Sequence, residues 1–412
     1  MYQISKKTRT INGNLDISGS KSESNRLLIL RAYTSFFNII NLSDSDDTNI
    51  MSNALDNDQK EVNIGHAGTA MRFLTSYFSS IKNSSKILTG STRMKQRPIS
   101  ILVNSLKELG AEISYTEKDG YPPIKIEGKL IKNNSTSLPA NISSQFLSSL
   151  MMLGTTLKDG LKINLISDIT SLPYVIMTKQ IIERIGGKVS ILPNRIIIQK
   201  LKSKEIEDQV VESDWSSASY FYSLVALSYS SDLTLKKYFK KSIQGDSKLV
   251  EIYSRLGVKT TYKNGKIILT KNSLKIPSKI SLNLIENPDL AQTIIVTCLG
   301  LGIDCYLNGL HTLKIKETDR LSALKNEIQK FGVDKVEITK DSIRLVNKSP
   351  LKSNVRIDTY NDHRMAMSFA PLSIIKPISI MNPEVISKSY KNFWLDLESL
   401  GFTIYKNKQS NT

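Results

Sequence analysis

The sequence repeats one short pattern five times, and this periodicity limits the folds that the chain can adopt. In each copy an amphipathic run leads to an apolar-Gly-apolar phrase, which a β-rich stretch follows. The glycines are separated by 76, 71, 75 and 69 residues, and the phrases are LGA at Leu109, IGG at Ile185, LGV at Leu256, FGV at Phe331 and LGF at Leu400. A period this constant predicts repeated supersecondary units.

Each glycine of the pattern has the context of a helix C-cap that precedes a strand. The segments that follow alternate apolar and polar residues around turn residues, as in AEISYTEKDGYPPIKIEG (111–128) and TTYKNGKIILT (260–270). Alternation with a period of two is typical of half-buried strands, and the central turn residues predict hairpins.

A second set of helices is nearly apolar on all faces, and a helix of this kind is buried. These helices are spaced by 47, 75, 72, 73 and 73 residues, and they begin near Ser22, Thr69, Ser144, Ser216, Asp289 and Asp362. The spacing predicts six βαβαββ-like units in an α/β fold, three units in each of two domains. The first unit is predicted to be shortened around 55–63, where neither the glycine phrase nor a hairpin occurs.

The openings of the buried helices carry side chains suited to anions. Helix N-termini present free N–H groups and partial positive charge. A single serine or aspartate at a helix start is explained by N-capping alone. Several of these helix starts also carry Lys or Arg, which N-capping does not explain. The residues concerned are Lys21, Ser22, Arg26, Gly68, Thr69, Ser143, Ser144, Gln145, Asp289, Asp362 and Arg364.

The net charge of +18 is compatible with a nucleic-acid, membrane or small anionic partner. The excess lysines are dispersed rather than clustered, which favours a small anion over nucleic acid. No apolar run approaches the roughly 20 residues of a membrane span, and the start lacks an apolar signal region. We therefore expect a cytoplasmic protein.

The two cysteines, Cys298 and Cys305, lie in apolar stretches of the sequence and have no metal-ligand spacing. We therefore expect them to be core residues, and we expect no metal site.

Seven segments together resemble one enzyme family from end to end and in order. They are SGSKSESNR (18–26), HAGTAMRF (66–73), STRMKQRPI (91–99), SSQFL (143–147), SDWSSASYF (213–221), KETDRL (316–321) and NDHRMAM (361–367). The chain resembles the 3-phosphoshikimate 1-carboxyvinyltransferases, or EPSP synthases. This resemblance implies transfer of the enolpyruvyl group of phosphoenolpyruvate to the 5-hydroxyl of shikimate 3-phosphate, in the shikimate pathway to chorismate and the aromatic amino acids.

The resemblance also implies an inside-out α/β barrel in each of two domains, with three repeats around buried helices. By analogy the first domain comprises residues 20–211, and the second comprises residues 1–19 plus 212–412. A monomer without cofactor is expected, with small anionic substrates and no nucleic-acid or membrane partner.

The family's binding residues can be carried over by position. The resemblance implies that shikimate 3-phosphate binds to Lys21, Ser22, Arg26, Ser143, Ser144, Gln145, Ser171, Tyr174, Asp289 and Lys316. It implies that phosphoenolpyruvate binds to Lys21, Gly68, Arg97, Gln145, Arg320, Arg364 and Lys388. Serine hydroxyls and cations suit phosphate, and the planar guanidinium suits phosphate and carboxylate.

Three residues are predicted to be catalytic: Asp289, Glu317 and Lys21. We expect Asp289 to act on the 5-hydroxyl, Glu317 on the methylene carbon, and Lys21 or Lys388 on the leaving phosphate. The sequence leaves open which group carries each proton transfer, because neighbouring cations and burial shift carboxylate pKa values in opposite directions.

The chain departs from the family pattern at four places. His66 stands where the family usually has Asn, Phe73 replaces a proline seen in some members, Thr312 stands where Asn is expected, and the first repeat is short. Two other functions fit the sequence less well. An enolpyruvyl transferase acting on UDP-N-acetylglucosamine usually carries a cysteine in the loop corresponding to 90–97, which here reads GSTRMKQR. An RNA-binding protein would show aromatic residues interleaved with basic ones, and the motifs lack this pattern.

Overall fold

In the computed structural model, which describes residues 1–34, 37–202, 205–272, 275–346 and 349–406, the chain divides into two compact units. The terminal unit comprises residues 1–18 and 212–412, and the central unit comprises residues 19–211.

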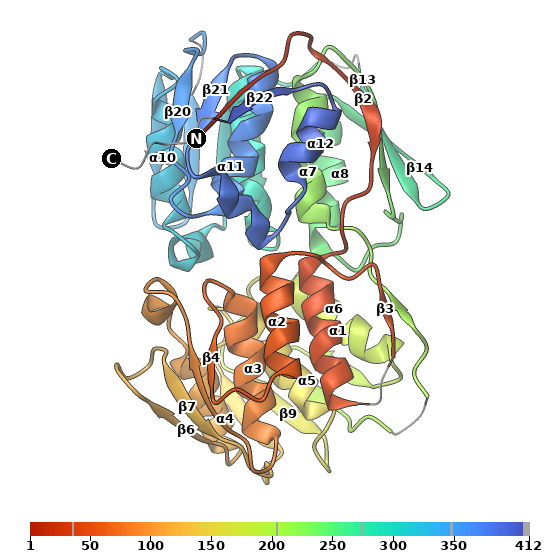
Figure 1. Ribbon diagram of the computed structural model, residues 1–412, viewed down its shortest axis with the longest axis vertical. Helices are drawn as coiled ribbons and strands as arrows, with labels where there is room; N and C mark the ends of the chain where they lie inside the picture. The colour runs from red at the N-terminus through yellow and green to blue at the C-terminus, as the bar shows by residue number, and fades with distance from the viewer. Residues whose placement is uncertain (35–36, 203–204, 273–274, 347–348, 407–412) are drawn as a thin grey trace. The chain divides into compact units, whose positions relative to one another are not determined.

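The central unit contains both helices and strands (Figure 1). Its helices are α1 (Lys21–Tyr33), α2 (Asp46–Asp56), α3 (Gly68–Ser80), η1 (Met94–Gln96), α4 (Ser100–Glu108), α5 (Ser144–Gly154) and α6 (Leu172–Arg184). Its strands are β3 (Ile39–Ile40), β4 (Glu61–Asn63), β5 (Ser85–Thr89), β6 (Glu112–Tyr115), β7 (Ile124–Glu127), β8 (Ser135–Leu138), β9 (Leu161–Leu165), β10 (Val189–Leu192), β11 (Arg195–Ile198) and β12 (Gln209–Val210).

Two sheets of the central unit have the same topology, with strand orders β4-β5-β7-β6 and β8-β9-β11-β10. In each sheet the first two strands are parallel and a hairpin adds two antiparallel strands. A buried helix, α3 or α5, joins the parallel pair, as a parallel connection requires. The sequence of elements in both is therefore βαβαββ.

The first repeat of the central unit is shorter than the other two. It contains α1, β3 and α2, and β3 pairs with β12 in a two-stranded parallel sheet. The helix α2 ends at Asp56 and β4 begins at Glu61, so no hairpin lies between them. This agrees with the 47-residue spacing of the first two buried helices.

The terminal unit contains the remaining elements. Its helices are α7 (Trp215–Leu227), η2 (Gly245–Lys248), α8 (Leu249–Ser254), η3 (Pro288–Leu290), α9 (Ala291–Leu301), η4 (His311–Ile315), α10 (Arg320–Gln329), α11 (His363–Phe369), η5 (Ala370–Ile374), η6 (Pro383–Lys388) and α12 (Phe393–Ser399). Its strands are β1 (Tyr2–Ser5), β2 (Thr10–Leu15), β13 (Ser230–Lys236), β14 (Val258–Lys263), β15 (Lys266–Lys271), β16 (Lys279–Asn283), β17 (Asp304–Asn308), β18 (Lys335–Ile338), β19 (Ile343–Val346), β20 (Val355–Ile357), β21 (Ile378–Ile380) and β22 (Thr403–Lys406).

Three four-stranded sheets of the terminal unit repeat the same order: β2-β13-β15-β14, β16-β17-β19-β18 and β20-β21-β1-β22. The two N-terminal strands complete two of them. The strand β2 lies beside β13 (Figure 1) and runs parallel to it. The strand β1 lies between β21 and β22, antiparallel to both. The start of the chain is therefore part of the same folded unit as its end.

The buried helices form the core of each unit. In the terminal unit α9 packs against both α7 and α11, and nearly every residue of the three helices is buried. In the central unit α5 packs against α3 and α6 in the same way. Cys298 and Cys305 lie in the core of the terminal unit, as predicted.

The five repeat glycines end their helices as predicted. The φ angles of Gly110, Gly186, Gly257, Gly332 and Gly401 are all positive, between 79° and 99°. A residue with a β-carbon adopts such angles at a cost, which explains why glycine recurs there. Each glycine is followed within three residues by the first strand of a hairpin or, in the last repeat, by β22.

Candidate functional site

The guanidinium of Arg320 is the centre of a charged cluster in the terminal unit. Arg320 is the first residue of α10, and its side chain is only 2% exposed. Its Nε lies 2.7 Å from Asp362 Oδ2, its Nη1 lies 3.0 Å from Asp289 Oδ1, and its Nη2 lies 2.8 Å from Glu317 Oε2. One guanidinium therefore joins three carboxylates that come from three helix starts or turns.

Three further cations complete this cluster. Arg364 Nη2 lies 3.1 Å from Asp289 Oδ2, and Lys316 Nζ lies 3.5 Å from Asp289 Oδ1. Lys388, the last residue of η6, places its Nζ 3.0 Å from Glu317 Oε1. Four cations thus face three carboxylates. We call these seven side chains the Arg320 cluster; its members are Asp289, Lys316, Glu317, Arg320, Asp362, Arg364 and Lys388.

The charges of the Arg320 cluster reinforce one another. Burial alone would raise the pKa of Asp289, but Arg364, Lys316 and Arg320 outweigh it and hold that pKa well below its usual range. Burial would lower the pKa of Arg320, and the carboxylates of Asp362, Glu317 and Asp289 raise it instead. Asp289 is therefore an anion, and Arg320 a cation, at neutral pH.

The low pKa of Asp289 should be visible in the pH dependence of stability. Because the pKa is lower in the folded chain, ionised Asp289 stabilises the fold above the unfolded value of about 3.9, and this contribution is lost as the pH falls through the folded value. We expect an Asp289→Asn variant to unfold at a lower temperature than the parent at neutral pH, with a difference that shrinks below about pH 4. Scanning fluorimetry at a series of pH values measures it, and a difference independent of pH would contradict the assignment.

A second set of polar contacts holds the segment that precedes α11. Tyr360 and Asn361 both have φ angles in the left-handed region, 52° and 54°. The buried carboxylate of Glu327 accepts hydrogen bonds from the Tyr360 hydroxyl at 2.7 Å and from the Asp358 amide at 3.0 Å. These bonds hold the turn that precedes Asp362. The Asp362 carboxylate caps α11 and accepts a hydrogen bond from Arg320.

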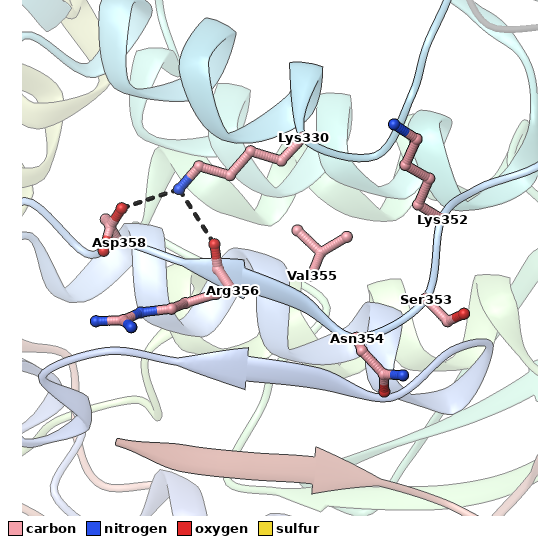
Figure 2. A pocket seen from close by; sticks show the side chains of 7 residues that line it. All are labelled: Lys330, Lys352, Ser353, Asn354, Val355, Arg356 and Asp358. Carbon is pink, nitrogen blue, oxygen red and sulfur yellow. Dashed lines mark hydrogen bonds and ion pairs between the residues drawn. The ribbon is translucent and has the colours of Figure 1, made fainter. Parts of the chain in front are cut away.

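Lys330 reinforces this turn from the solvent side. Its Nζ lies 2.6 Å from Glu327 Oε2 and 2.9 Å from Asp358 Oδ2, and it also donates to the Arg356 carbonyl (Figure 2). Lys330 lines a cavity of about 370 Å³ whose walls also include Lys352, Arg356 and Asp358. None of the predicted site residues lines this cavity.

The predicted residues of the central unit gather at the starts of its buried helices. Lys21 is the first residue of α1, and its Nζ lies 3.1 Å from Asp47 Oδ2 in α2. Ser143 caps α5, accepting a hydrogen bond from the Gln145 amide. The Gln145 side chain donates to Thr69 Oγ1 at 3.2 Å, so the starts of α3 and α5 are joined directly.

Gly68, at the start of α3, lies under two guanidinium groups. A β-carbon at Gly68 would lie 2.5 Å from Arg97 Nη1 and 2.8 Å from Arg72 Nη1. Arg72 Nη1 donates to the Gly68 carbonyl at 2.9 Å. Two cations and a helix N-terminus therefore meet at a residue without a side chain, an arrangement that suits an anion.

Arg26 lies deeper than the other predicted residues of the central unit. It is 2% exposed, and burial lowers the pKa of its guanidinium to about 10. Its Nη1 donates to the Ser22 carbonyl at 2.7 Å, and its Nε donates to Thr178 Oγ1 at 2.7 Å. The guanidinium also lies over the ring of Phe73, 5.4 Å from its centroid. Arg26 thus supports the first turn of α1 from within.

The other predicted residues lie at the starts of α5 and α6. Ser144 is the first residue of α5, and Ser171 precedes α6 with a left-handed φ of 56°. The Tyr174 carbonyl accepts a hydrogen bond from Thr178. Of the residues that depart from the family pattern, Thr312 is buried, and His66 places its Nδ1 3.0 Å from Ser91 Oγ.

The structure thus places the predicted residues in two groups, one in each unit. The terminal unit holds Asp289, Lys316, Glu317, Arg320, Arg364 and Lys388, and the central unit holds Lys21, Ser22, Arg26, Gly68, Arg97, Ser143, Ser144, Gln145, Ser171 and Tyr174. The sequence did not identify Asp47, Arg72 or Asp362 as partners of these residues. Asp362 and Arg72 lie inside the quoted motifs, whereas nothing in the local sequence marks Asp47.

Within the described ranges, no group of three or more His, Cys, Asp or Glu side chains has an arrangement that could hold a metal ion. The candidate ligands are instead anions, which the cations and helix starts above suit. Among the helices of the described residues, none combines the length and apolarity needed to cross a membrane.

Comparisons with known proteins give one consistent result. A family model described as EPSP synthase (3-phosphoshikimate 1-carboxyvinyltransferase) matches residues 56–397. The chain is 43% identical over 398 residues to a 3-phosphoshikimate 1-carboxyvinyltransferase of Bacteroides fragilis, covering 96% of both chains. It is 33% identical to that of Colwellia psychrerythraea, covering 93% of this chain and 96% of the relative.

Solved structures of similar fold cover nearly the whole chain. An EPSP synthase of Acinetobacter baumannii aligns with a TM-score of 0.77 and 20% identity, covering 98% of this chain and 99% of its own. The enolpyruvyl transferase NikO of Streptomyces tendae aligns with a TM-score of 0.73 and 12% identity, covering 98% of each chain. At these identities the likeness concerns the fold.

Proposed function

This chain belongs to the EPSP synthase family, and we propose from this that it transfers the enolpyruvyl group of phosphoenolpyruvate to the 5-hydroxyl of shikimate 3-phosphate. The products are 5-enolpyruvylshikimate 3-phosphate and phosphate, on the route to chorismate. The observation that supports this chemistry most directly is the Arg320 cluster, in which cations keep Asp289 ionised beside other groups that can bind anions.

We propose an addition followed by an elimination. In the addition, the 5-hydroxyl oxygen bonds to C2 of phosphoenolpyruvate, the hydroxyl proton leaves, and a proton is added to the C3 methylene carbon. The product is a tetrahedral ketal. In the elimination, C3 loses a proton, the C2–O bond to phosphate breaks, and the enol ether remains. Atoms balance without a cofactor or metal.

Asp289 is the proposed base for the hydroxyl proton, because it is ionised at neutral pH and 16% exposed. Glu317 is the proposed group for proton exchange at C3. Its two oxygens contact Arg320 and Lys388, so Lys388 lies where it could also assist the departing phosphate. Lys21, paired with Asp47 in the central unit, is the other candidate for that role.

We propose the predicted binding residues for the two substrates. The hydroxyls of Ser22, Ser143, Ser144 and Ser171, the side chains of Gln145 and Tyr174, and the cations Lys21, Arg26 and Lys316 would bind shikimate 3-phosphate together with Asp289. Phosphoenolpyruvate would contact Lys21, Gln145, the Gly68 backbone, Arg97, Arg320, Arg364 and Lys388. Because both ligands are polyanions, the excess of cations at these sites would stabilise their binding.

We also propose that the buried helices and sheets of each unit form the inside-out barrel of enolpyruvyl transferases. The repeated βαβαββ order of the sheets and the buried cores of α7, α9 and α11 support this arrangement. A monomer acting in the cytoplasm, with small-molecule partners alone, is the proposed working form.

The function is tested by phosphate release from phosphoenolpyruvate with and without shikimate 3-phosphate. We expect release that requires shikimate 3-phosphate and that is absent with UDP-N-acetylglucosamine as acceptor. Release with the nucleotide sugar alone would assign the chain to the cell-wall branch of enolpyruvyl transfer. Release with neither acceptor would contradict both proposals.

A Gly68→Ala variant is expected to weaken phosphoenolpyruvate binding. The new β-carbon would lie within 2.8 Å of the guanidinium nitrogens of Arg72 and Arg97, so these groups must move. Displacing one charge-assisted contact should raise KM for phosphoenolpyruvate roughly tenfold. Steady-state rates with each substrate varied in turn measure this effect. An equal rise in KM for shikimate 3-phosphate would show that the change is not local to Arg97.

A further inference from the structure

The carboxylate of Asp246 is buried beside the Arg320 cluster but is not a member of it. It lies in η2 and is 4% exposed. Its Oδ2 accepts a hydrogen bond from Ser216 Oγ at 2.5 Å, and its Oδ1 accepts one from Asn287 Nδ2 at 3.4 Å. Ser216 is the second residue of α7, and Asn287 lies two residues before Asp289. One carboxylate thus joins two segments that border the cluster.

Ser216 links Asp246 to Arg364. Arg364 Nη2 lies 3.4 Å from Ser216 Oγ and 3.1 Å from Asp289 Oδ2, and its Nη1 donates to the Asp289 carbonyl at 3.2 Å. The Ser216 hydroxyl can donate its one proton to Asp246 while its oxygen accepts from Arg364. The Nη2 group of Arg364 is therefore shared between the Asp289 carboxylate and the Ser216 hydroxyl, which in turn is bonded to Asp246.

The charged groups around Asp246 make its ionisation sensitive to pH. Burial raises the pKa of Asp246 to about 6, with a further rise from Asp289 and a small one from Asp214, while Arg364 and the Ser216 hydrogen bond oppose it. These neighbours belong to η3, to the N-cap of α7 and to α11. The carboxyl group would therefore gain its proton within the range in which enzymes are assayed.

We infer that Asp246 is a positioning residue for phosphoenolpyruvate, which acts by holding Arg364 through the Ser216 hydroxyl. The ionised carboxylate accepts the Ser216 proton and leaves the serine oxygen to Arg364. A protonated carboxyl would instead donate to that oxygen and compete with the Arg364 N–H group. This inference rests on the proposed function, because it concerns the substrate that Arg364 is proposed to bind.

The test compares the parent enzyme with Asp246→Asn, Ser216→Ala and the double variant, from about pH 5 to pH 8.5. Ser217→Ala is the matched control, because this hydroxyl lies in the same helical turn and binds Asp214 at 2.8 Å but is not linked to Arg364. Initial rates with each substrate varied give kcat and both KM values. Thermal unfolding of every variant reports on folding.

At pH 8 we expect each single variant to raise KM for phosphoenolpyruvate about tenfold, several times more than KM for shikimate 3-phosphate, as the loss of one charge-assisted contact predicts. The double variant should raise this KM no more than either single variant does, and Ser217→Ala should match the parent within about twofold.

The pH dependence gives a second expectation. The kcat/KM for phosphoenolpyruvate of the parent, divided by that of Asp246→Asn, should fall towards one as the pH falls through about 6. Ionisation of the substrate phosphate affects all variants alike and cancels in this ratio.

A ratio that stays constant with pH, additive single effects, or equal shifts in both KM values would overturn the inference. If Asp246→Asn does not fold, Ser216→Ala replaces it in the test. Removal of the Ser216 hydroxyl should abolish the change in kcat/KM for phosphoenolpyruvate near pH 6. A parent enzyme that releases no phosphate with shikimate 3-phosphate would count against the proposed function first. An active parent with a flat ratio would count against the role of Asp246 alone.

Discussion

Replacing Asp289 with asparagine is expected to lower kcat for the shikimate 3-phosphate reaction by about 10³-fold, within the range that general-base groups contribute. The substitution keeps the size of the side chain but removes the anion that would accept the 5-hydroxyl proton. It also removes a negative charge that Arg320, Arg364 and Lys316 share. Single-turnover and steady-state phosphate release measure the chemical step.

The control for this substitution is Asp232→Asn, which changes an exposed aspartate in β13 of the same unit. We expect this variant to retain the parent's kcat. If Asp289→Asn lost less than about tenfold in kcat, Asp289 could not be the base, because even a modest general base contributes more than that. Glu317 would then be the first residue to test in the same way.

Replacing Arg320 with methionine is expected to destabilise the terminal unit by about 3–5 kcal/mol, the usual effect of removing one partner from a buried ion pair. The carboxylates of Asp362, Asp289 and Glu317 would lose their common cation, and the first of these is fully buried. The variant should unfold at a markedly lower temperature and release no measurable phosphate. Calorimetry and the phosphate assay give the two results.

One further variant separates the charge of Arg320 from its geometry, and a variant of an exposed arginine serves as the control. Arg320→Lys keeps the charge, but one ammonium group cannot bridge three carboxylates as the planar guanidinium does, so we expect partial recovery of stability and little recovery of activity. Arg344→Ala removes an arginine that is 59% exposed and lies 3.8 Å from Glu337. Because exposed pairs contribute about 0–1 kcal/mol, this control should match the parent, and a comparable loss there would contradict the argument.

Much of the architecture follows from short stretches of sequence. The six buried helices were predicted to begin within two residues of where they do, because their apolar residues and polar openings are local features. The five repeat glycines were predicted to end helices, and each has a positive φ angle. The missing hairpin of the first repeat was predicted from the short spacing and from the lack of a glycine phrase and a hairpin pattern at 55–63, and in the structure β4 is the next element after α2.

The pairing of the N-terminal strands was not visible in the repeat. Residues 2–5 form the third strand of a sheet whose other strands all lie beyond residue 354, and 10–15 pair with 230–235. The periodic pattern describes each repeat along the chain and does not specify which distant segment completes a sheet. Resemblance to the family placed these residues in the second domain, but the residues by themselves did not.

The sequence by itself determined which chemical groups are available: the helix starts, the repeat, and the cations and carboxylates of the motifs. The tertiary structure decided which of these groups meet, such as Arg320 with Asp362 or Lys21 with Asp47. The proposed role of Asp246 was likewise visible only in the folded chain, because it depends on the burial of the carboxylate and on its hydrogen bond with Ser216, 30 residues away in the sequence. The physical reason is that helix formation depends on neighbours in sequence, whereas pKa values and ion pairs depend on desolvation and on charges within a few ångströms, which only packing brings together.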